Sequence, residues 1–235
     1  MRKCDYRQKW HQSSRATTIS LQRLWCLSGP GTEASGEKKD KTIILTAYQE
    51  RVSMRGLERI FAVSRQQVAR WIREHVQDLP PLKETLLPVQ PGDVLELDEA
   101  WSFVLKKANK HWLWTAMCRR TRQILAFVIG DRSEKTCRRL WKRIPIAYRN
   151  CLAYSDFWKA YQNVIPTTQH VAVGKDSGET NHMERWYCTL RQRQARYVRK
   201  TLSFSKSEAF HHMVTTWFII EHNLTRKSML TSLTS

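Results

Sequence analysis

Three acidic residues in a strongly basic chain have the clearest potential for chemistry. They are Asp98 in LELDEAWSF, Asp156 in AYSDFWKAY and Glu184 in NHMERWYCTLRQR. The chain carries 40 Lys and Arg against 21 Asp and Glu, which gives a formal net charge of +19. Carboxylates that meet at one point would form a negative well suited to a divalent metal, and the basic surround suits a phosphate backbone. This combination indicates a nuclease or a strand-transfer enzyme.

Each acid also has an ordinary structural explanation. Asp98 could be an exposed charge on a strand edge, Asp156 could cap the helix that follows it, and Glu184 could pair with Arg185 on a helix surface. Taken singly, each explanation is at least as good as catalysis. The metal hypothesis depends on all three acids lying on elements that one fold brings together.

Composition narrows the class of protein. A chain of 235 residues accommodates one core of ordinary size and a small additional module, and 41% hydrophobic residues with ten Trp indicate a folded core. The basic excess favours nucleic acid as the partner, with an anionic membrane surface second. No apolar run approaches the ~20 residues of a membrane span, and the N-terminus has no signal-peptide pattern. We therefore expect a cytoplasmic, nucleoid-associated protein with no membrane partner.

The six cysteines never form a C-x-x-C pair. In a reducing compartment Cys118 and Cys151 are expected to behave as small hydrophobic residues. Cys4, His11 and Cys26 could supply some zinc ligands, but a closed structural site needs four ligands at short spacings. Neither a disulfide framework nor a zinc site is expected.

Residues 42–77 have the pattern of a helix-turn-helix DNA-binding domain. Ser53 and Ser64 stand where N-caps are needed, and a tight turn separates the last two helices. Apolar residues recur at spacings of three and four, at Leu57, Ile60, Phe61, Val68, Trp71 and Ile72. The later of these two helices, which begins after Ser64, is the expected recognition helix. The residues on its early turns that are expected to reach base edges or phosphates are Arg65, Gln66, Gln67 and Arg70. A plain three-helix cap on the next domain is the alternative.

The remaining chain divides by composition. Residues 1–41 are expected to form a poorly ordered arm that ends in the breaker-rich stretch SGPGTEASGEKKDK, and the four prolines of residues 78–93 mark a linker. From 94 to 129 alternation predicts a three-strand antiparallel meander. Then come helix 133–144, strand 151–155, helix 156–164, strand 169–173 and helix 178–198. We place the catalytic domain at 94–225 and a C-terminal tail at 226–235.

This order predicts an α/β fold, a mixed sheet with helices on its faces. Asp98 then lies on the first strand, Asp156 just after the fourth, and Glu184 on the last helix. Neighbouring strands lie ~4.8 Å apart, so the two aspartates can approach one metal site, which Glu184 can complete. We expect Mg²⁺ or Mn²⁺ as two ions ~4 Å apart, which would activate a water or a 3′-hydroxyl.

Basic residues follow Glu184. Arg191 lies seven positions later, on the same helical face, where it could hold a phosphate beside the metals. No acid interrupts the segment from Arg185 to Lys206. Such a run could be a solvated basic face, but beside a carboxylate site it is expected to follow a DNA backbone through Arg193, Arg196, Arg199 and Lys200.

Several separate motifs resemble the catalytic region of transposases of the IS-one insertion-sequence family. They are ELDEAWSF, IGDRSEKT, YSDFWKAY, AVGKDSGETNHMER and LRQRQARYVRKTLSFSKS, within residues 42–222. The resemblance implies a DDE recombinase with an RNase H-like catalytic domain behind a helix-turn-helix. By this resemblance, Asp98, Asp156 and Glu184 correspond to the three catalytic acids of the family. Arg191 corresponds to the basic residue that often follows the glutamate.

The resemblance also sets the expected function and one departure. It implies a DNA transposase that binds element ends, cleaves them and transfers strands into target DNA, and strand transfer at two ends leads us to expect a homo-oligomer. Members of the family usually begin with a zinc ribbon that contains two C-x-x-C pairs. Residues 1–41 contain neither pair, so this segment is interpreted as a degenerate or lost ribbon. A catalytically defective DNA-binding regulator, and an RNase H-like nuclease acting on hybrids or junctions, are the alternatives.

Overall fold

The computed structural model describes residues 33–198 and 200–232, so most of the expected N-terminal arm lies outside the described part. The chain divides after Lys39, and Asp40–Ser235 form the second of its two units. Helix α1 spans Glu33–Gln49 and begins inside the stretch that the sequence predicted to be a linker. Its Glu, Lys and Ala residues have high helix propensity, which outweighs the single glycine at 36.

The second unit is built around a five-stranded mixed sheet with the strand order β3-β2-β1-β4-β5. The β1–β2 and β2–β3 pairs are antiparallel, and the β1–β4 and β4–β5 pairs are parallel. The predicted α/β arrangement, a mixed sheet made of a meander followed by two strand-helix units, is confirmed. The strands are β1 (Val94–Phe103), β2 (Lys110–Cys118), β3 (Ile124–Gly130), β4 (Leu152–Ser155) and β5 (His170–Ala172).

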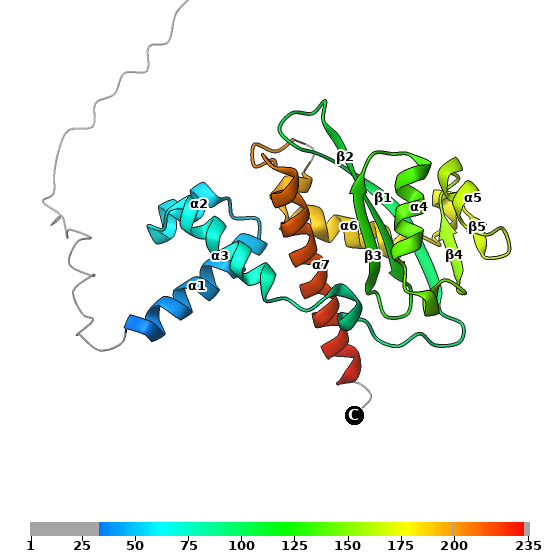
Figure 1. Ribbon diagram of the computed structural model, residues 1–235, viewed down its shortest axis with the longest axis horizontal. Coiled ribbons are helices and arrows are strands. Elements are labelled where there is room, and N and C mark those ends of the chain that lie inside the picture. The colour runs from blue at the N-terminus through cyan, green and yellow to red at the C-terminus, as the bar shows by residue number, and fades with distance from the viewer. Residues whose placement is uncertain (1–32, 199, 233–235) are drawn as a thin grey trace, which may run out of the picture. The chain divides into compact units, whose positions relative to one another are not determined.

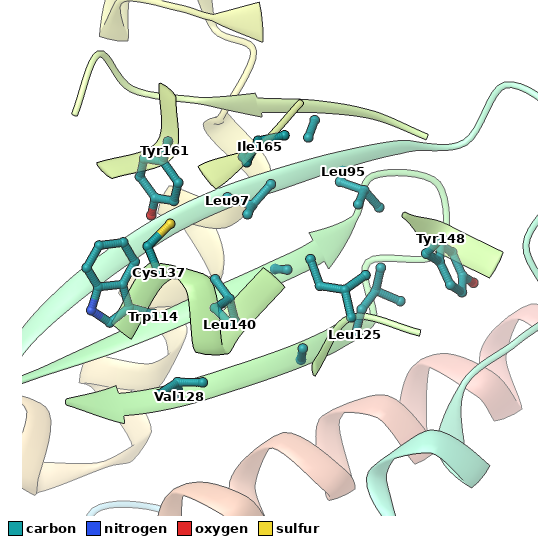
Figure 2. Close-up of a cluster of buried hydrophobic side chains, with 14 of the residues drawn as sticks. Leu95, Leu97, Trp114, Leu125, Val128, Cys137, Leu140, Tyr148, Tyr161 and Ile165 are labelled. Atoms are coloured by element: carbon teal, nitrogen blue, oxygen red, sulfur yellow. The ribbon is translucent and has the colours of Figure 1, made fainter. Parts of the chain in front are cut away.

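Helices cover both faces of this sheet (Figure 1). One face packs against α4 and α5 through a cluster that includes Leu97, Trp114, Leu140 and Tyr161 (Figure 2). The other face packs against α6 and α7. Because both faces are buried, even the polar positions of the central strand β1 lie largely inside the protein. The helices are α4 (Glu134–Arg143), α5 (Lys159–Val164), α6 (Asn181–Arg193) and α7 (Glu208–Thr231).

Some helix boundaries differ from the sequence prediction. The helix expected at 156–164 begins only at Lys159. The helix expected at 178–198 is shorter, because α6 ends at Arg193 and a 3₁₀ turn, Ala195–Tyr197, follows it. Further 3₁₀ turns span Leu82–Thr85, Ile146–Tyr148 and Lys175–Ser177.

The predicted helix-turn-helix is present as α2 (Met54–Phe61) and α3 (Arg65–Gln77). The Ser53 and Ser64 hydroxyls accept hydrogen bonds from Gly56 N and Gln67 N, as N-caps should. Ala62 joins the helices in the left-handed region at φ 53°. The predicted apolar stripe holds for Leu57, Val68 and Ile72, but it was wrong for Ile60, which is 67% exposed.

Helix α7 was not predicted as an element, and it contradicts both the place of α6 as the last helix and the tail that was expected from residue 226. Its Val214 and Trp217 pack with Val68 and Ile72 of α3 in one apolar cluster. The expected helix-turn-helix domain therefore shares a core with the end of the chain. Neither α7 nor any other helix in the described residues is long and apolar enough to cross a membrane.

The Pro-rich segment 78–93 is also held in place. Thr85 is fully buried, and Asn223 of α7 donates to its hydroxyl over 3.0 Å. The Asn223 amide also bonds both backbone groups of Ile124 at the start of β3, over 2.8 and 2.9 Å. Gln123 accepts from Leu87 N and donates to Thr85 O. One buried amide network thus fastens the linker, β3 and α7 together.

We predict that Asn223→Ala lowers the free energy of unfolding by about 3 kcal/mol, because it leaves buried backbone groups of Ile124 without partners. Thr225→Ala, an exposed substitution one half-turn further along α7, should change it by no more than about 0.5 kcal/mol. Urea denaturation measures both. Equal effects would mean that the amide network contributes nothing specific.

Candidate active site

Asp98 lies in the middle of β1, on the central strand of the sheet. It pairs with Thr115 of β2 in the antiparallel register. The Tyr187 hydroxyl of α6 donates to the Asp98 carbonyl over 2.8 Å and lies 2.6 Å from the Thr115 hydroxyl. Because Tyr187 is buried, this contact holds α6 against β1 at the level of Asp98. Glu184 stands three residues earlier on the same helix, and its side chain is exposed.

Asp156 reaches the same level from the neighbouring strand. The parallel β1–β4 ladder pairs Val94 with Leu152 and Glu96 with Tyr154, a constant offset that places Asp156 opposite Asp98 just beyond the last pair. Adjacent strands lie ~4.8 Å apart. The Asp156 carboxylate accepts from Trp158 N over 3.0 Å, so it closes the turn before α5 and is not the N-cap of that helix, which is Trp158.

The three acids influence one another electrostatically. The pKa of Asp98 is raised to about 7, first by burial and then by the negative charges of Glu99, Asp156 and Glu184. A hydrogen bond from Glu99 N to the Asp98 carboxylate opposes this rise. Asp98 is therefore at the centre of a negative field to which both other predicted acids contribute.

Within the described residues, none of these three acids forms an ion pair. The flanking acids behave differently, because Glu96 pairs with Arg119 at 2.9 Å and Glu99 pairs with Arg132 at 2.5 Å. In a chain of charge +19, these carboxylates, which form no ion pair in the described residues, make the surroundings of Asp98 negative.

The chemistry of the donor set fits a hard divalent cation, because it offers carboxylate oxygens that form no ion pair with a basic side chain in the described residues. However, the described residues contain no group of three or more His, Cys, Asp or Glu side chains already gathered as metal ligands. Glu184 is exposed on α6 and would have to turn toward the aspartates. Cys4, His11 and Cys26, considered above for zinc, lie outside the described residues.

Glu96 and Glu99 flank Asp98 on β1. Both are buried on the central strand. Glu96 accepts from Arg119 and from Met183 N, and its carboxylate lies 2.7 Å from His182 Nδ1. His182 of α6 thus faces Glu96. Burial raises the pKa of Glu96 despite these partners.

Glu99 supports the other side of the site. It accepts from the Tyr161 hydroxyl over 2.8 Å and pairs with Arg132, whose guanidinium lies between the rings of Trp112 and Trp158 at 4.7 and 4.2 Å. Trp158 belongs to the turn that Asp156 closes. The signal that the sequence offered was two acids on a strand whose neighbours are mostly apolar.

The predicted basic residues separate into distinct groups. Arg191 is half-buried on α6, with its guanidinium 5.9 Å from the Tyr187 ring. Arg193 pairs with Glu50 at 2.7 Å. Arg196 is only 9% exposed and donates to Ser205 and Tyr48, so the prediction that it follows a DNA backbone was wrong. Lys200 is exposed, and Arg199 lies outside the described residues.

On α3 the four predicted DNA contacts lie away from the shared core. Arg65, Gln66 and Arg70 are exposed, whereas Gln67 is half-buried. Arg65 pairs with Glu58 at 3.1 Å and Arg70 with Glu74 at 3.6 Å. These surface pairs are weak enough for a phosphate to displace.

Comparisons with known proteins identify the family. The family profile described as IS1 transposase matches residues 94–225. The insertion element iso-IS1n protein InsB of Shigella dysenteriae is 40% identical over 129 residues, which cover 55% of this chain and 95% of that protein. The insertion element IS1 4 protein InsB of Escherichia coli (strain K12) is 35% identical over 147 residues, covering 58% and 85%.

Among solved structures, the simian T-cell lymphotropic virus intasome in complex with PP2A regulatory subunit B56 gamma matches 74% of this chain and 64% of that chain. This match has 7% identity and a TM-score of 0.31, a likeness too weak to support an inference. The sequence matches define an enzyme that acts on DNA. The chain belongs to the IS1 transposase family, whose members here are proteins of insertion elements.

The raised pKa of Asp98 predicts a specific pH dependence of stability. The unfolded carboxyl ionises near 3.8 and the folded one near 7. Protonated Asp98 therefore contributes fully to the free energy of unfolding below pH 3.8. This contribution is lost as the pH rises to about 7, and above that pH the free energy of unfolding no longer changes because of Asp98. Asp98→Asn should remove this loss, so its free energy of unfolding relative to wild type should rise by roughly 1 to 3 kcal/mol between pH 5 and 8.

Urea denaturation at each pH, without divalent metal, measures this difference. Asp176→Asn, which replaces an exposed acid between β5 and α6, is the matched control and should follow the wild-type profile. A pH profile of Asp98→Asn parallel to that of the wild type would show that Asp98 ionises normally in the folded protein.

Proposed function

We propose that this transposase catalyses metal-dependent strand cleavage and strand transfer at the ends of its insertion element. Asp98, Asp156 and Glu184 are the proposed metal-holding acids. The observation that carries the proposal is their electrostatic coupling around Asp98 without a neutralising cation in the described residues. In a protein of charge +19, such a site favours a divalent ion and a phosphate backbone together.

Mg²⁺ or Mn²⁺, as two ions, would lower the pKa of the attacking water or 3′-hydroxyl and stabilise the leaving oxygen. The protein's own groups prepare the site for such ions. The pKa of Asp98 is raised to about 7, and a bound cation would lower it again by offsetting the neighbouring negative charges. The Glu96–Arg119 and Glu99–Arg132 pairs keep the flanking acids engaged, so that they do not compete. Arg191 is proposed to hold a phosphate beside the acids.

End recognition is assigned to α3. Its exposed Arg65, Gln66 and Arg70, with the half-buried Gln67, can donate to base edges and phosphates in a major groove. We further propose that the protein works as a homo-oligomer on DNA, because two element ends must be joined to one target. Binding to chromosomal DNA would associate it with the nucleoid.

Single replacements of the acids test the chemistry. We predict that Asp98→Asn, Asp156→Asn and Glu184→Gln each lower Mg²⁺-dependent cleavage and joining at least 100-fold, because each removes a carboxylate needed for the metal. Binding to an element-end duplex should remain within about twofold. Asp176→Asn should retain activity. Gel assays of cleaved and joined products measure the chemistry, and fluorescence anisotropy measures the binding.

A second readout does not depend on activity. Mg²⁺ at pH 8 should raise the melting temperature of the wild type, since a ligand that binds the folded state stabilises it, and this rise should disappear in Asp98→Asn. Wild-type end binding without any metal-dependent product would favour a regulator that lacks catalysis. Cleavage of hybrids or junctions in preference to element ends would favour a nuclease.

Base readout by α3 predicts a change in specificity. Gln66→Ala should reduce the preference for the element end over an unrelated duplex by about 5- to 100-fold, because a bidentate base contact is lost. If Arg70 contacts a phosphate, Arg70→Ala should weaken binding to both duplexes equally and reduce the salt dependence of binding. Anisotropy titrations over a range of salt concentrations measure both effects. Unchanged specificity in Gln66→Ala would remove this residue from the base-reading surface.

A further inference from the structure

A cleft of about 690 Å³ lies between the helix-turn-helix and the segment that follows α6. Its walls come from the end of α1, the loop after it, α2 and α3 on one side, and from residues 194–210 on the other. Two of its lining residues, Arg65 and Arg196, were predicted from the sequence to contact DNA, but no cleft was predicted. It is distinct from the three acids, and only Arg65 belongs both to the cleft and to the proposed base-reading residues of α3.

The lining of the cleft is strongly cationic. Seven basic side chains contribute to it and no acidic residue does. Of these cations only Arg65 has an acidic partner among the described residues, namely Glu58 at 3.1 Å. Unpaired cations in a concave site concentrate the field and attract an anion. The cations that the argument uses are Arg51, Arg55, Arg59, Arg73 and Lys206.

Apolar side chains, two of them aromatic, also line the cleft. Phe204 and Phe210 are half-buried, and Leu202 is 98% exposed. The Arg73 guanidinium lies 6.0 Å from the centre of the Phe210 ring. Guanidinium groups and aromatic rings together are the surfaces that bind the phosphates and bases of an unpaired strand.

The size of the cleft excludes a duplex. A volume of about 690 Å³ lies within the ~300–1,000 Å³ range of sites for compact ligands. One or two nucleotides fit such a space, whereas double-stranded DNA can only lie across its mouth. Paired bases also hide the ring faces that Phe204 and Phe210 would contact.

The cleft is joined to the strand that carries Asp98. Leu105 N donates to Ser205 O over 2.8 Å, and the Phe103 and Phe204 rings lie 5.5 Å apart. Phe103 ends β1, five residues after Asp98, which is about 17 Å along a strand. A strand held in the cleft would therefore be connected to the acids through one rigid element.

We propose that this cleft binds a single-stranded DNA segment, with phosphates on Arg55 and Arg59 and a base against Phe204. The proposal rests on the proposed function for the identity of the strand, which would be a strand separated at an element end. It adds to that function a second DNA site with a preference for unpaired DNA.

The test compares a labelled 12-nucleotide single strand with the matching duplex and the matching RNA, by fluorescence anisotropy with the full chain. The double variant Arg55→Gln/Arg59→Gln should bind the single strand at least 10-fold more weakly, and the slope of log affinity against log salt should fall by about 1.4, since each single-strand phosphate contact contributes ~0.7. Binding to the element-end duplex should change by less than threefold. Both arginines are exposed, so the fold should tolerate the change.

Phe204→Leu should weaken single-strand binding about 5- to 100-fold without changing the salt slope, because a stacking contact is lost while the charges remain. The matched control is Lys135→Gln/Lys142→Gln, which removes two exposed charges from α4 on the opposite face of the sheet. It should change single-strand binding by less than threefold.

Equal losses for single strand and duplex in the arginine variant would overturn the proposal, since they would indicate a general basic surface. A loss of the same size in the lysine control would overturn it for the same reason, and tighter binding of the RNA than of the DNA would overturn the assignment to DNA. A wild-type protein that binds single strands through the cleft but gives no metal-dependent product would support the cleft and contradict the proposed function.

Discussion

The parallel pairing of β4 with β1 is the constraint on which the site depends. Its register brings Asp156 level with Asp98 although 58 positions separate them along the chain. Tyr187 then fastens α6 to the Asp98 carbonyl, which sets the place of Glu184. A shift of one residue in the β1–β4 pair would send one aspartate to the opposite face of the sheet, because strand side chains alternate.

The distribution of positive charge matters as much as the position of the acids. Glu96 and Glu99 flank Asp98 and are each neutralised by an arginine, and both arginines also stack on aromatic rings. The pairs compensate two buried charges, which would otherwise be costly. Burial raises the pKa of Asp98, and the negative charges of Glu99, Asp156 and Glu184 raise it further.

Helix α7 connects the helix-turn-helix to the five-stranded sheet. Trp217 of α7 packs with Val68 and Ile72 of α3, while Phe218 and Ile219 pack on the sheet face that also holds Tyr187. Arg196, which the sequence suggested as a DNA contact, instead joins Tyr48 of α1 to Ser205. Helix α3 and the sheet that carries Asp98 therefore belong to one packed body.

Local signals in the sequence determined much of this protein. Alternation marked the strands, serine caps marked α2, α3 and α4, and the separate motifs indicated the family, which the comparisons confirm. These features depend on neighbouring residues, so they can be read along the chain. The burial of Glu96, Glu99 and Arg196, the role of α7 in a shared core, and the basic cleft were decided only by tertiary structure. Each depends on contacts between residues far apart in sequence, and the physical cost of a buried charge becomes visible only when its partner is known.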